Sequence, residues 1–280
     1  MGVRLLHKRQ RQKNASTDIA LWNTLSSSDL IGVKELEVEL DFYNEVIVFN
    51  SAEDTPQQDG FFHGEGDGMT INLLSTEEEI GVYGSLIDTN SNNIYHFYPG
   101  SDGVNIAQKS VSDFEESDDH VSIQEKGFGF YDNGEASNDH GDILDIMVVW
   151  TTNAECANSD LSEGCTLTHV TKSNMIGKIR LAIAETNAAF SMSGINTKLR
   201  LVYSYRDSSY YESTSDRLWH ALQDITYRYD GWLDDVHVKR AKYGADLVSF
   251  WINADRCGLS WMGPSKDYMF SVVSQKCATG

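Results

Sequence analysis

Cysteine is absent from the first 155 residues of this 280-residue chain, and the four cysteines follow at positions 156, 165, 257 and 277. No Cys-x-x-Cys pair occurs, which argues against a zinc site built from thiolates. The even number and the two near pairs favour the disulfides Cys156–Cys165 and Cys257–Cys277. Four cysteines permit three connectivities, and four free buried thiols are the alternative. Disulfides would indicate an oxidising, extracellular compartment.

Long apolar runs are missing as well. No run of about 18 apolar residues occurs, so we expect no membrane span. The N-terminal residues MGVRLLHKRQRQKNAST are basic but lack the apolar segment of a secretory signal, and no signal peptide is visible. If the cysteines are bonded, we expect the true N-terminus to lie outside this sequence.

Positive charge is scarce and unevenly placed. The chain has 22 basic and 42 acidic residues, of which residues 1–142 hold 8 and 27. Such an acidic chain repels a phosphate backbone, so nucleic acid is not an expected partner. The contrast between the halves indicates two units with different roles, although a solvated acidic surface that aids solubility is an alternative.

The motifs of several active-site classes do not occur. The eight histidines include no pair one helical turn apart, and the nearest two, His220 and His237, are 17 residues apart. There is no Gly-x-Ser-x-Gly elbow and no Gly-rich dinucleotide fingerprint. The run GEGDG at 64–68 lacks a following Gly-Lys-Ser/Thr and the acidic spacing of a calcium loop, so we interpret it as a turn. We therefore assign no catalytic and no metal-binding residue in this chain.

The first half has the pattern of a small antiparallel β-region. Apolar and acidic residues alternate within 33–49, and short apolar runs separated by turn residues follow up to residue 98. We expect residues 1–30 to be a loosely ordered lead-in. Residues 112–142 carry ten acidic residues and one lysine, which is typical of an exposed linker; an ordinary surface loop is an equal alternative.

The second half alternates strands and helices. We expect buried strands at 143–151 and 245–252, a strand at 198–206, and short strands at 258–262 and 270–274. Helices are expected from Thr171 or Ser173 to about Met192, over 215–228, and from a cap at Asp230 to Gly244. This order predicts βαβ units and a mostly parallel sheet. The fold class is then α+β overall, with an antiparallel β-region followed by an α/β unit.

Several blocks of the second half resemble one known family. The runs AIAETNAAF, DGWLDDVHVKRAKYGADLV, GADLVSFWI, CGLSWMG and FSVVSQKCATG are similar, in this order, to metzincin-type zinc endopeptidases, especially the reprolysin-like and peptidyl-aspartate metalloendopeptidase groups. The resemblance covers residues 142–280 and implies the upper catalytic subdomain. In that family a helix carrying HExxHxxGxxH would follow; here the sequence ends before it. The resemblance implies zinc for a full-length member and none for this chain as given.

The same resemblance assigns roles along the chain. Residues 1–111 would be a β-rich propeptide, 112–142 a linker and 143–280 a partial catalytic domain. No cysteine precedes Cys156, so this propeptide has no cysteine switch. An extended peptide or protein substrate would pair with the edge strand by β-augmentation, through Gly258, Leu259, Ser260, Trp261 and Met262. The alternative is an ordinary edge strand beside a disulfide.

The resemblance implies a fragment of a secreted zinc-dependent endopeptidase, which we expect to be inactive as written because HExxHxxGxxH is absent. A first rival hypothesis is a non-catalytic secreted protein that binds peptides or proteins on a protease-like scaffold. A second is a plain α/β structural domain whose resemblance is accidental.

Overall fold

The architecture was obtained from a computed structural model of the chain. The structure describes residues 3–6, 30–40, 45–51, 60–75, 81–100, 103–110, 120–122, 143–158, 165–262 and 265–279. The described part forms two compact units, and each contains segments from both halves of the sequence. The first comprises residues 1–113, 176–195 and 279–280, and the second comprises 114–175 and 196–278.

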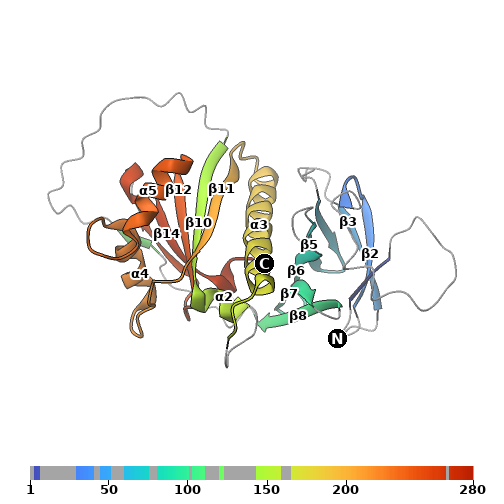
Figure 1. Ribbon diagram of the computed structural model, residues 1–280. Coiled ribbons are helices and arrows are strands. Elements are labelled where there is room, and N and C mark those ends of the chain that lie inside the picture. The colour runs from blue at the N-terminus through green and yellow to red at the C-terminus, as the bar shows by residue number, and fades with distance from the viewer. Residues whose placement is uncertain are drawn as a thin grey trace. The chain divides into compact units, whose positions relative to one another are not determined.

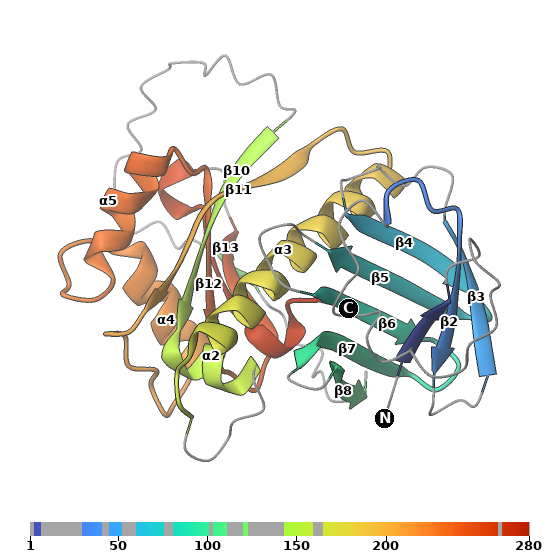
Figure 2. The ribbon, with the colours of Figure 1, turned by 45° about the vertical axis from the view of Figure 1, so that its right-hand side comes forward.

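The first unit contains an eight-stranded antiparallel sheet in which each strand pairs with the next along the chain. Its strands are β1 (Val3–Leu6), β2 (Glu35–Leu40), β3 (Glu45–Ser51), β4 (Phe61–Gly66), β5 (Met69–Ser75), β6 (Val82–Asp88), β7 (Asn93–Gly100) and β8 (Gly103–Ser110). Figure 2 shows β4 to β7 as neighbours in that order. The antiparallel β-region is confirmed, but the lead-in contains a strand, because β1 pairs with β2.

Local sequence explains the sheet's turns and its core. The GEGDG run is a turn only in part: Gly64 to Gly66 belong to strand β4. Asp67 and Gly68, with positive φ angles of 51° and 74°, join β4 to β5 as a two-residue hairpin loop. One face of the sheet buries an apolar cluster that includes Val38, Phe49, Ile71, Leu73, Leu86 and Phe97. Because alternate residues of a strand face opposite sides, the residues between them, such as His63, Asn72 and Ser85, lie on the other face.

The second unit is built on a six-stranded sheet in the order β11-β10-β12-β14-β13-β9. Its strands are β9 (His120–Ser122), β10 (Ile143–Thr151), β11 (Lys198–Asp207), β12 (Leu247–Ile252), β13 (Gly258–Met262) and β14 (Phe270–Ser274). The pairs β10/β11, β10/β12, β12/β14 and β13/β9 are parallel, and only β13/β14 is antiparallel among them. A mostly parallel sheet with β12 in its interior is therefore present, as expected.

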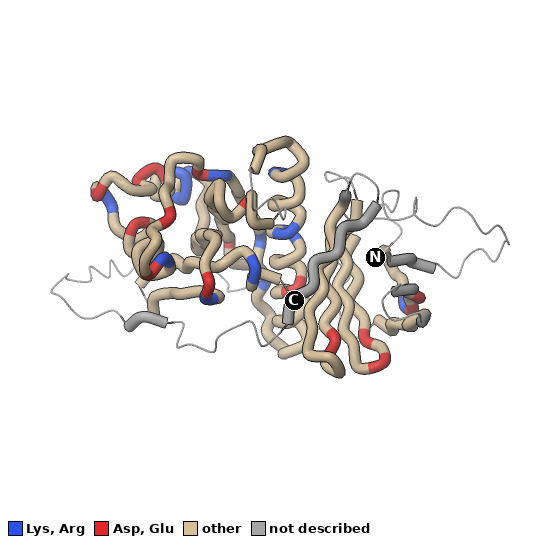
Figure 3. The backbone as a smooth tube through the Cα atoms, turned by 90° about the horizontal axis from the view of Figure 1, so that it is seen from below, with Lys and Arg blue, Asp and Glu red and all other residues tan. Residues whose placement is uncertain are grey.

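The helices are α2 (Thr152–Asn158), α3 (His169–Met192), α4 (Arg217–Thr226) and α5 (Asp234–Tyr243), with short 3-10 turns at Lys266–Tyr268 and Gln275–Cys277. Figure 1 shows α4 and α5 together beside the sheet, and their Leu222, Ile225 and Val236 pack with strand residues such as Val149 and Phe250. Acidic and basic residues are interspersed over this unit (Figure 3). Among the described residues, no helix is long and apolar enough to cross a membrane.

The helix boundaries correct two predicted caps. At the start of α3, Thr168 and Thr171 exchange hydrogen bonds, each backbone N–H donating to the other's hydroxyl at 3.0 and 3.2 Å, so Thr168 is the cap. α5 begins at Asp234, later than a cap at Asp230 would place it, while Gly244 ends it with a φ of 66° as predicted. Gly194, with a φ of 70°, follows the end of α3.

Candidate functional site

The residues predicted to bind peptide form strand β13. Gly258, Leu259 and Ser260 pair with Val273, Val272 and Ser271 of β14 in antiparallel register. Leu259 is buried in the apolar core of the second unit, whereas Met262 is 56% exposed. Strand alternation puts Ser260 and Met262 on the face opposite to Leu259 and Trp261. The strand therefore has one anchored face and one face on which Met262 reaches solvent.

Trp261 fixes β13 against the helical layer. Its indole N–H donates to the Thr226 hydroxyl at 2.7 Å, and that hydroxyl donates to the Leu222 carbonyl at 2.6 Å. Its ring makes edge contacts with other aromatic rings at centroid distances of 5.6 to 6.4 Å, namely those of Trp219, Tyr227 and Tyr268. These partners were not predicted from the sequence, because they lie on three separate segments. A partly buried aromatic cluster of this kind holds the strand in place, which suits a template for a second strand.

Both predicted disulfides are present. Cys156 is bonded to Cys165 and Cys257 to Cys277, with Cα–Cα distances of 5.6 and 5.3 Å. The second bond joins the residue before β13 to the turn after β14. There the Ser274 amide donates to the Cys257 carbonyl at 2.7 Å, and the Ser274 hydroxyl donates to the Ala254 carbonyl at 2.8 Å. The bond and these contacts hold β13 and β14 in register.

The expectation that 258–262 forms the outer edge of the sheet is wrong. Ser260, Trp261 and Met262 pair in parallel with His120, Val121 and Ser122 of β9, which comes from the acidic linker. A three-residue strand inside an acidic stretch gives no periodic signal, so the sequence did not reveal it. The backbone edge that a bound peptide would use is thus paired with a segment of this chain.

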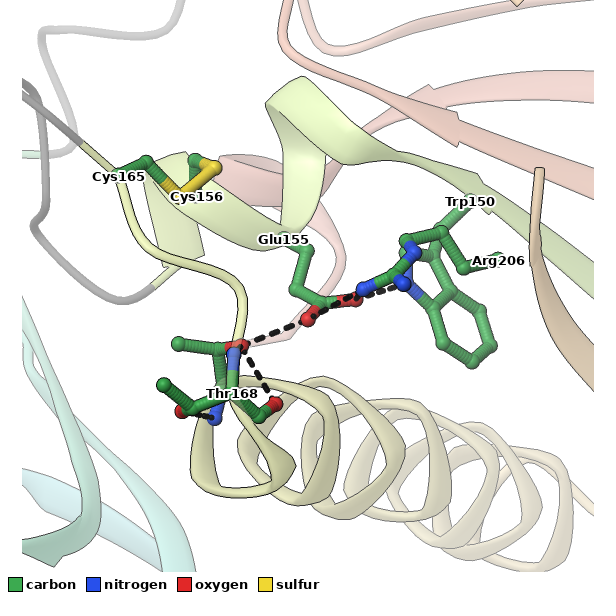
Figure 4. A network of polar contacts seen from close by, with 7 residues as sticks. Trp150, Glu155, Cys156, Cys165, Thr168 and Arg206 are labelled. Carbon is green, nitrogen blue, oxygen red and sulfur yellow. Dashed lines mark hydrogen bonds and ion pairs between the residues drawn. A yellow bond between two sulfur atoms is a disulfide. The ribbon is translucent and has the colours of Figure 1, made fainter. Parts of the chain in front are cut away.

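A buried polar network lies at the carboxyl ends of β10 and β11 (Figure 4). Glu155 on α2 accepts hydrogen bonds from Trp150 Nε1 at 2.8 Å and from Thr171 Oγ1 at 2.7 Å. Arg206 Nη1 on β11 lies 3.1 Å from both carboxylate oxygens. A charge buried this deeply needs such partners. The network ties β10, α2, β11 and the first turn of α3 together.

A second buried carboxylate joins the ends of two parallel strands. Glu212 accepts from the Thr151 hydroxyl at the end of β10 and from the Asn253 amide just after β12. Burial raises the pKa of Glu212, and these hydrogen bonds oppose the shift. With 6% of its surface exposed, its carboxylate serves a structural contact.

The described residues do not fit a zinc site. Among them, no three His, Cys, Asp or Glu side chains gather closely enough to hold a metal ion. The histidines on the helices of the second unit lie on three separate helices: His169 and His220 are exposed on α3 and α4, and His237 is buried on α5. No step of a metal-dependent reaction can be assigned to these residues.

Comparison with known proteins gives the same family as the sequence motifs. Residues 157–275 match the profile of a family described as metallo-peptidase family M12B, reprolysin-like. A peptidyl-Asp metalloendopeptidase of Xanthomonas campestris pv. campestris is 35% identical over 112 residues, which are 38% of this chain and 25% of that protein. One of Stenotrophomonas maltophilia strain R551-3 is 34% identical over the same shares. The chain thus spans about a quarter of the length of these curated relatives.

A solved structure described as a chaperone-substrate complex aligns with 72% of this chain and 26% of that chain, at 16% identity and a TM-score of 0.31. That score is too low to indicate a shared fold. The similarity to known proteins therefore rests on the profile and on the two relatives. Residues 157–275 are similar to the reprolysin-like metallopeptidase family M12B and, over 112 residues, to peptidyl-Asp metalloendopeptidases.

Proposed function

We propose that residues 143–280 are the first part of the catalytic domain of a zinc-dependent endopeptidase, preceded by a propeptide over 1–111 and a linker over 112–142. The observation that carries this proposal is the family match over 157–275, supported by the printed names of the relatives. When bound, zinc would supply the activated water that hydrolyses a peptide bond. The described residues lack a ligand set, so this chain alone is expected to cleave nothing.

The part of the reaction that these residues would perform is to bind the substrate in an extended form. β13 is held on one side by β14, by a disulfide and by the Trp261 cluster. The backbone groups on its other side, which pair with β9, could instead pair with a peptide strand. Such β-augmentation binds peptides mainly through main-chain hydrogen bonds. Exposed Met262 would lie beside the substrate's side chains on the outward face.

β9 would regulate this edge. It pairs with the same backbone groups of β13 that an added peptide would use. A three-residue strand contributes few hydrogen bonds, so a longer peptide strand can displace it. In this proposal the linker masks the substrate edge until it is cut or displaced.

The two disulfides are consistent with an extracellular protein, because such bonds persist in oxidising compartments. We accordingly place the protein outside the cytosol. The rival function, a non-catalytic peptide-binding protein, shares the β13 edge and differs only in having no zinc. The lack of a ligand set among the described residues is the observation in its favour.

The experiment measures hydrogen exchange at 258–262 in the 280-residue chain, with and without an extended peptide library of mixed sequence. Val121→Pro removes a backbone donor from β9. We expect this substitution to speed hydrogen exchange in β13. Added peptide should restore the protection, and it should bind the Val121→Pro variant more tightly than it binds the wild type. Gly134→Pro, in the linker but outside β9, is the control. If Val121→Pro changes neither exchange nor peptide binding, peptide binding at this edge is rejected.

A further inference from the structure

The first unit brings together segments that a cut in the linker would place on different chains. Strands β1 to β8 belong to residues before 113, whereas residues 176–195, which include most of helix α3, and residues 279–280 belong to the second half. Neither disulfide crosses the linker, since all four cysteines follow it. After a cut at 123–142, only non-covalent contacts would hold this unit together.

The apolar part of that contact is close-packed. Phe61, Leu74 and Tyr83 lie on one face of the sheet, and Leu181, Ala184 and Ala188 lie along one face of α3. All six are 5% exposed or less. The helix approaches so closely at Gly177 that a Cβ atom there would overlap the Tyr83 ring. If the sheet dissociated, this apolar surface of α3 would be exposed to water, which is unfavourable.

A row of polar side chains crosses the same face and ends on the helix. His63, Asn72 and Ser85 are directly opposite one another on β4, β5 and β6. Asn72 Nδ2 donates to Ser85 Oγ at 3.1 Å, and Ser85 Oγ donates to Glu185 Oε1 of α3 at 2.6 Å. Asn72 Oδ1 is then the acceptor for His63 Nδ1 at 2.7 Å. Every hydrogen bond thus has a fixed direction, and the row ends on a carboxylate, the strongest acceptor available.

The row continues on β7 to His96, which contacts Thr279 near the end of the second half of the sequence. His96 on β7 is opposite Ser85, and its Nδ1 lies 3.1 Å from the hydroxyl of buried Thr279. The sheet therefore contacts α3 and the residues after β14 through neighbouring members of one row.

We propose that this face of the N-terminal sheet is a recognition surface for helix α3, specified by Glu185, and that the two pieces remain bound after the linker is cut. Cutting would then break the covalent link between β9 and β10 without releasing the N-terminal piece. This inference concerns association alone and does not depend on zinc or on peptide binding at β13.

The test uses the full chain with a specific protease site placed within 123–142. After complete cutting, size exclusion with light scattering over a dilution series measures the dissociation constant of the two pieces. We expect the wild-type pieces to co-elute at micromolar concentration. Glu185→Ala removes the acceptor of the Ser85 hydroxyl and should weaken binding about tenfold or more, whereas Glu185→Gln, which keeps an acceptor oxygen, should weaken it less.

Neighbouring alanines provide the matched control. Ala188 is 2% exposed in the contact, while Ala189 is exposed on the same helix. Ala188→Gln should weaken association strongly and Ala189→Gln should leave it unchanged. Circular dichroism of each uncut variant checks that it is folded. Separation of folded wild-type pieces at micromolar concentration, or equal affinities of the Glu185→Ala and Ala189→Gln variants, would overturn the proposal.

Discussion

At the scale of single residues, the second unit contains a buried carboxylate with several polar partners. Glu155 is fully buried and bonded to Trp150, Thr171 and Arg206. Asp145 on β10 and Arg200 on β11 form a second ion pair, whose arginine side chain is 59% exposed. The two pairs have similar chemistry and differ mainly in solvent access, so they allow a direct comparison of a buried and an exposed ion pair.

We predict that Glu155→Ala lowers the free energy of unfolding by about 3–5 kcal/mol, because it leaves the Arg206 charge and two hydrogen-bond donors without their acceptor. Arg200→Gln should change it little, since exposed pairs are screened by water. Urea denaturation measures both. Equal losses in the two variants would show that the Glu155 network is not a buried anchor.

His237 is predicted to make folding sensitive to acid. Burial first, and then the positive charges of Arg228 and Arg240, lower its pKa below the ordinary 6.5, while Asp234 opposes the shift. The unfolded chain takes up the proton near the ordinary value, so the folded state loses stability as the pH falls from 6.5 toward the lowered pKa.

The measurement is the melting temperature between pH 7.5 and 5. His237→Phe should flatten the wild-type decrease, because it removes the group that titrates and can still pack against Phe270. The same substitution at exposed His220 is the control. A wild-type slope that persists in His237→Phe would assign the acid sensitivity to other groups.

At the scale of elements, replacing Gly177 by alanine should have the opposite effect on stability to the one usual in a helix. Alanine in place of glycine within a helix usually stabilises it by about 1 kcal/mol. We predict that Gly177→Ala destabilises this protein, because the new methyl group would overlap the Tyr83 ring. Combining it with Tyr83→Leu should recover part of the loss in thermal unfolding. A stabilised Gly177→Ala single variant would contradict the close packing of α3 on the sheet.

The two disulfides should differ in their contributions. Their cysteines are 9 and 20 residues apart, and the loop-entropy estimate gives about 2.5 and 3 kcal/mol for these lengths. We therefore predict that Cys257→Ser with Cys277→Ser lowers stability more than Cys156→Ser with Cys165→Ser. Urea denaturation of the two double variants tests the order, and the reverse order would contradict it.

How much of the fold could be predicted depended on local pattern. β10, β12 and β14 are short apolar runs between turn residues, and α3 ends before Gly194, so the sequence predicted these elements in order. β9 could not be found, because its pairing with β13 is made by backbone groups across more than a hundred residues. The place of α3 in the first unit depends on Gly177 and Glu185 meeting Tyr83 and Ser85, a tertiary contact without a local signal.

The candidate site was predicted to a similar extent. The strand at 258–262 and both cysteine pairs follow from sequence and family resemblance, and the strand and bonds are present. The aromatic anchors of Trp261 were missed because they come from α4, its end and the 3-10 turn at Lys266–Tyr268. The peptide-binding role of β13 stays a prediction.

At the scale of the whole molecule, the zinc content of the purified chain can be measured directly. Its described residues assemble no three metal-binding side chains. We predict that the purified 280-residue chain retains less than one zinc per molecule after dialysis, and that EDTA leaves its melting temperature unchanged. Stoichiometric zinc whose removal lowers the melting temperature would contradict the expectation that this chain binds no catalytic zinc.

The central claim is that residues 143–280 begin the catalytic domain of a zinc endopeptidase. The most direct measurement is to sequence the transcript beyond the codon for Gly280. The account predicts an open reading frame that continues shortly into HExxHxxGxxH, the helix that presents two histidines to one zinc and a glutamate to its water. A stop codon directly after Gly280, or a continuation without that motif, would contradict the enzyme and leave the peptide-binding protein.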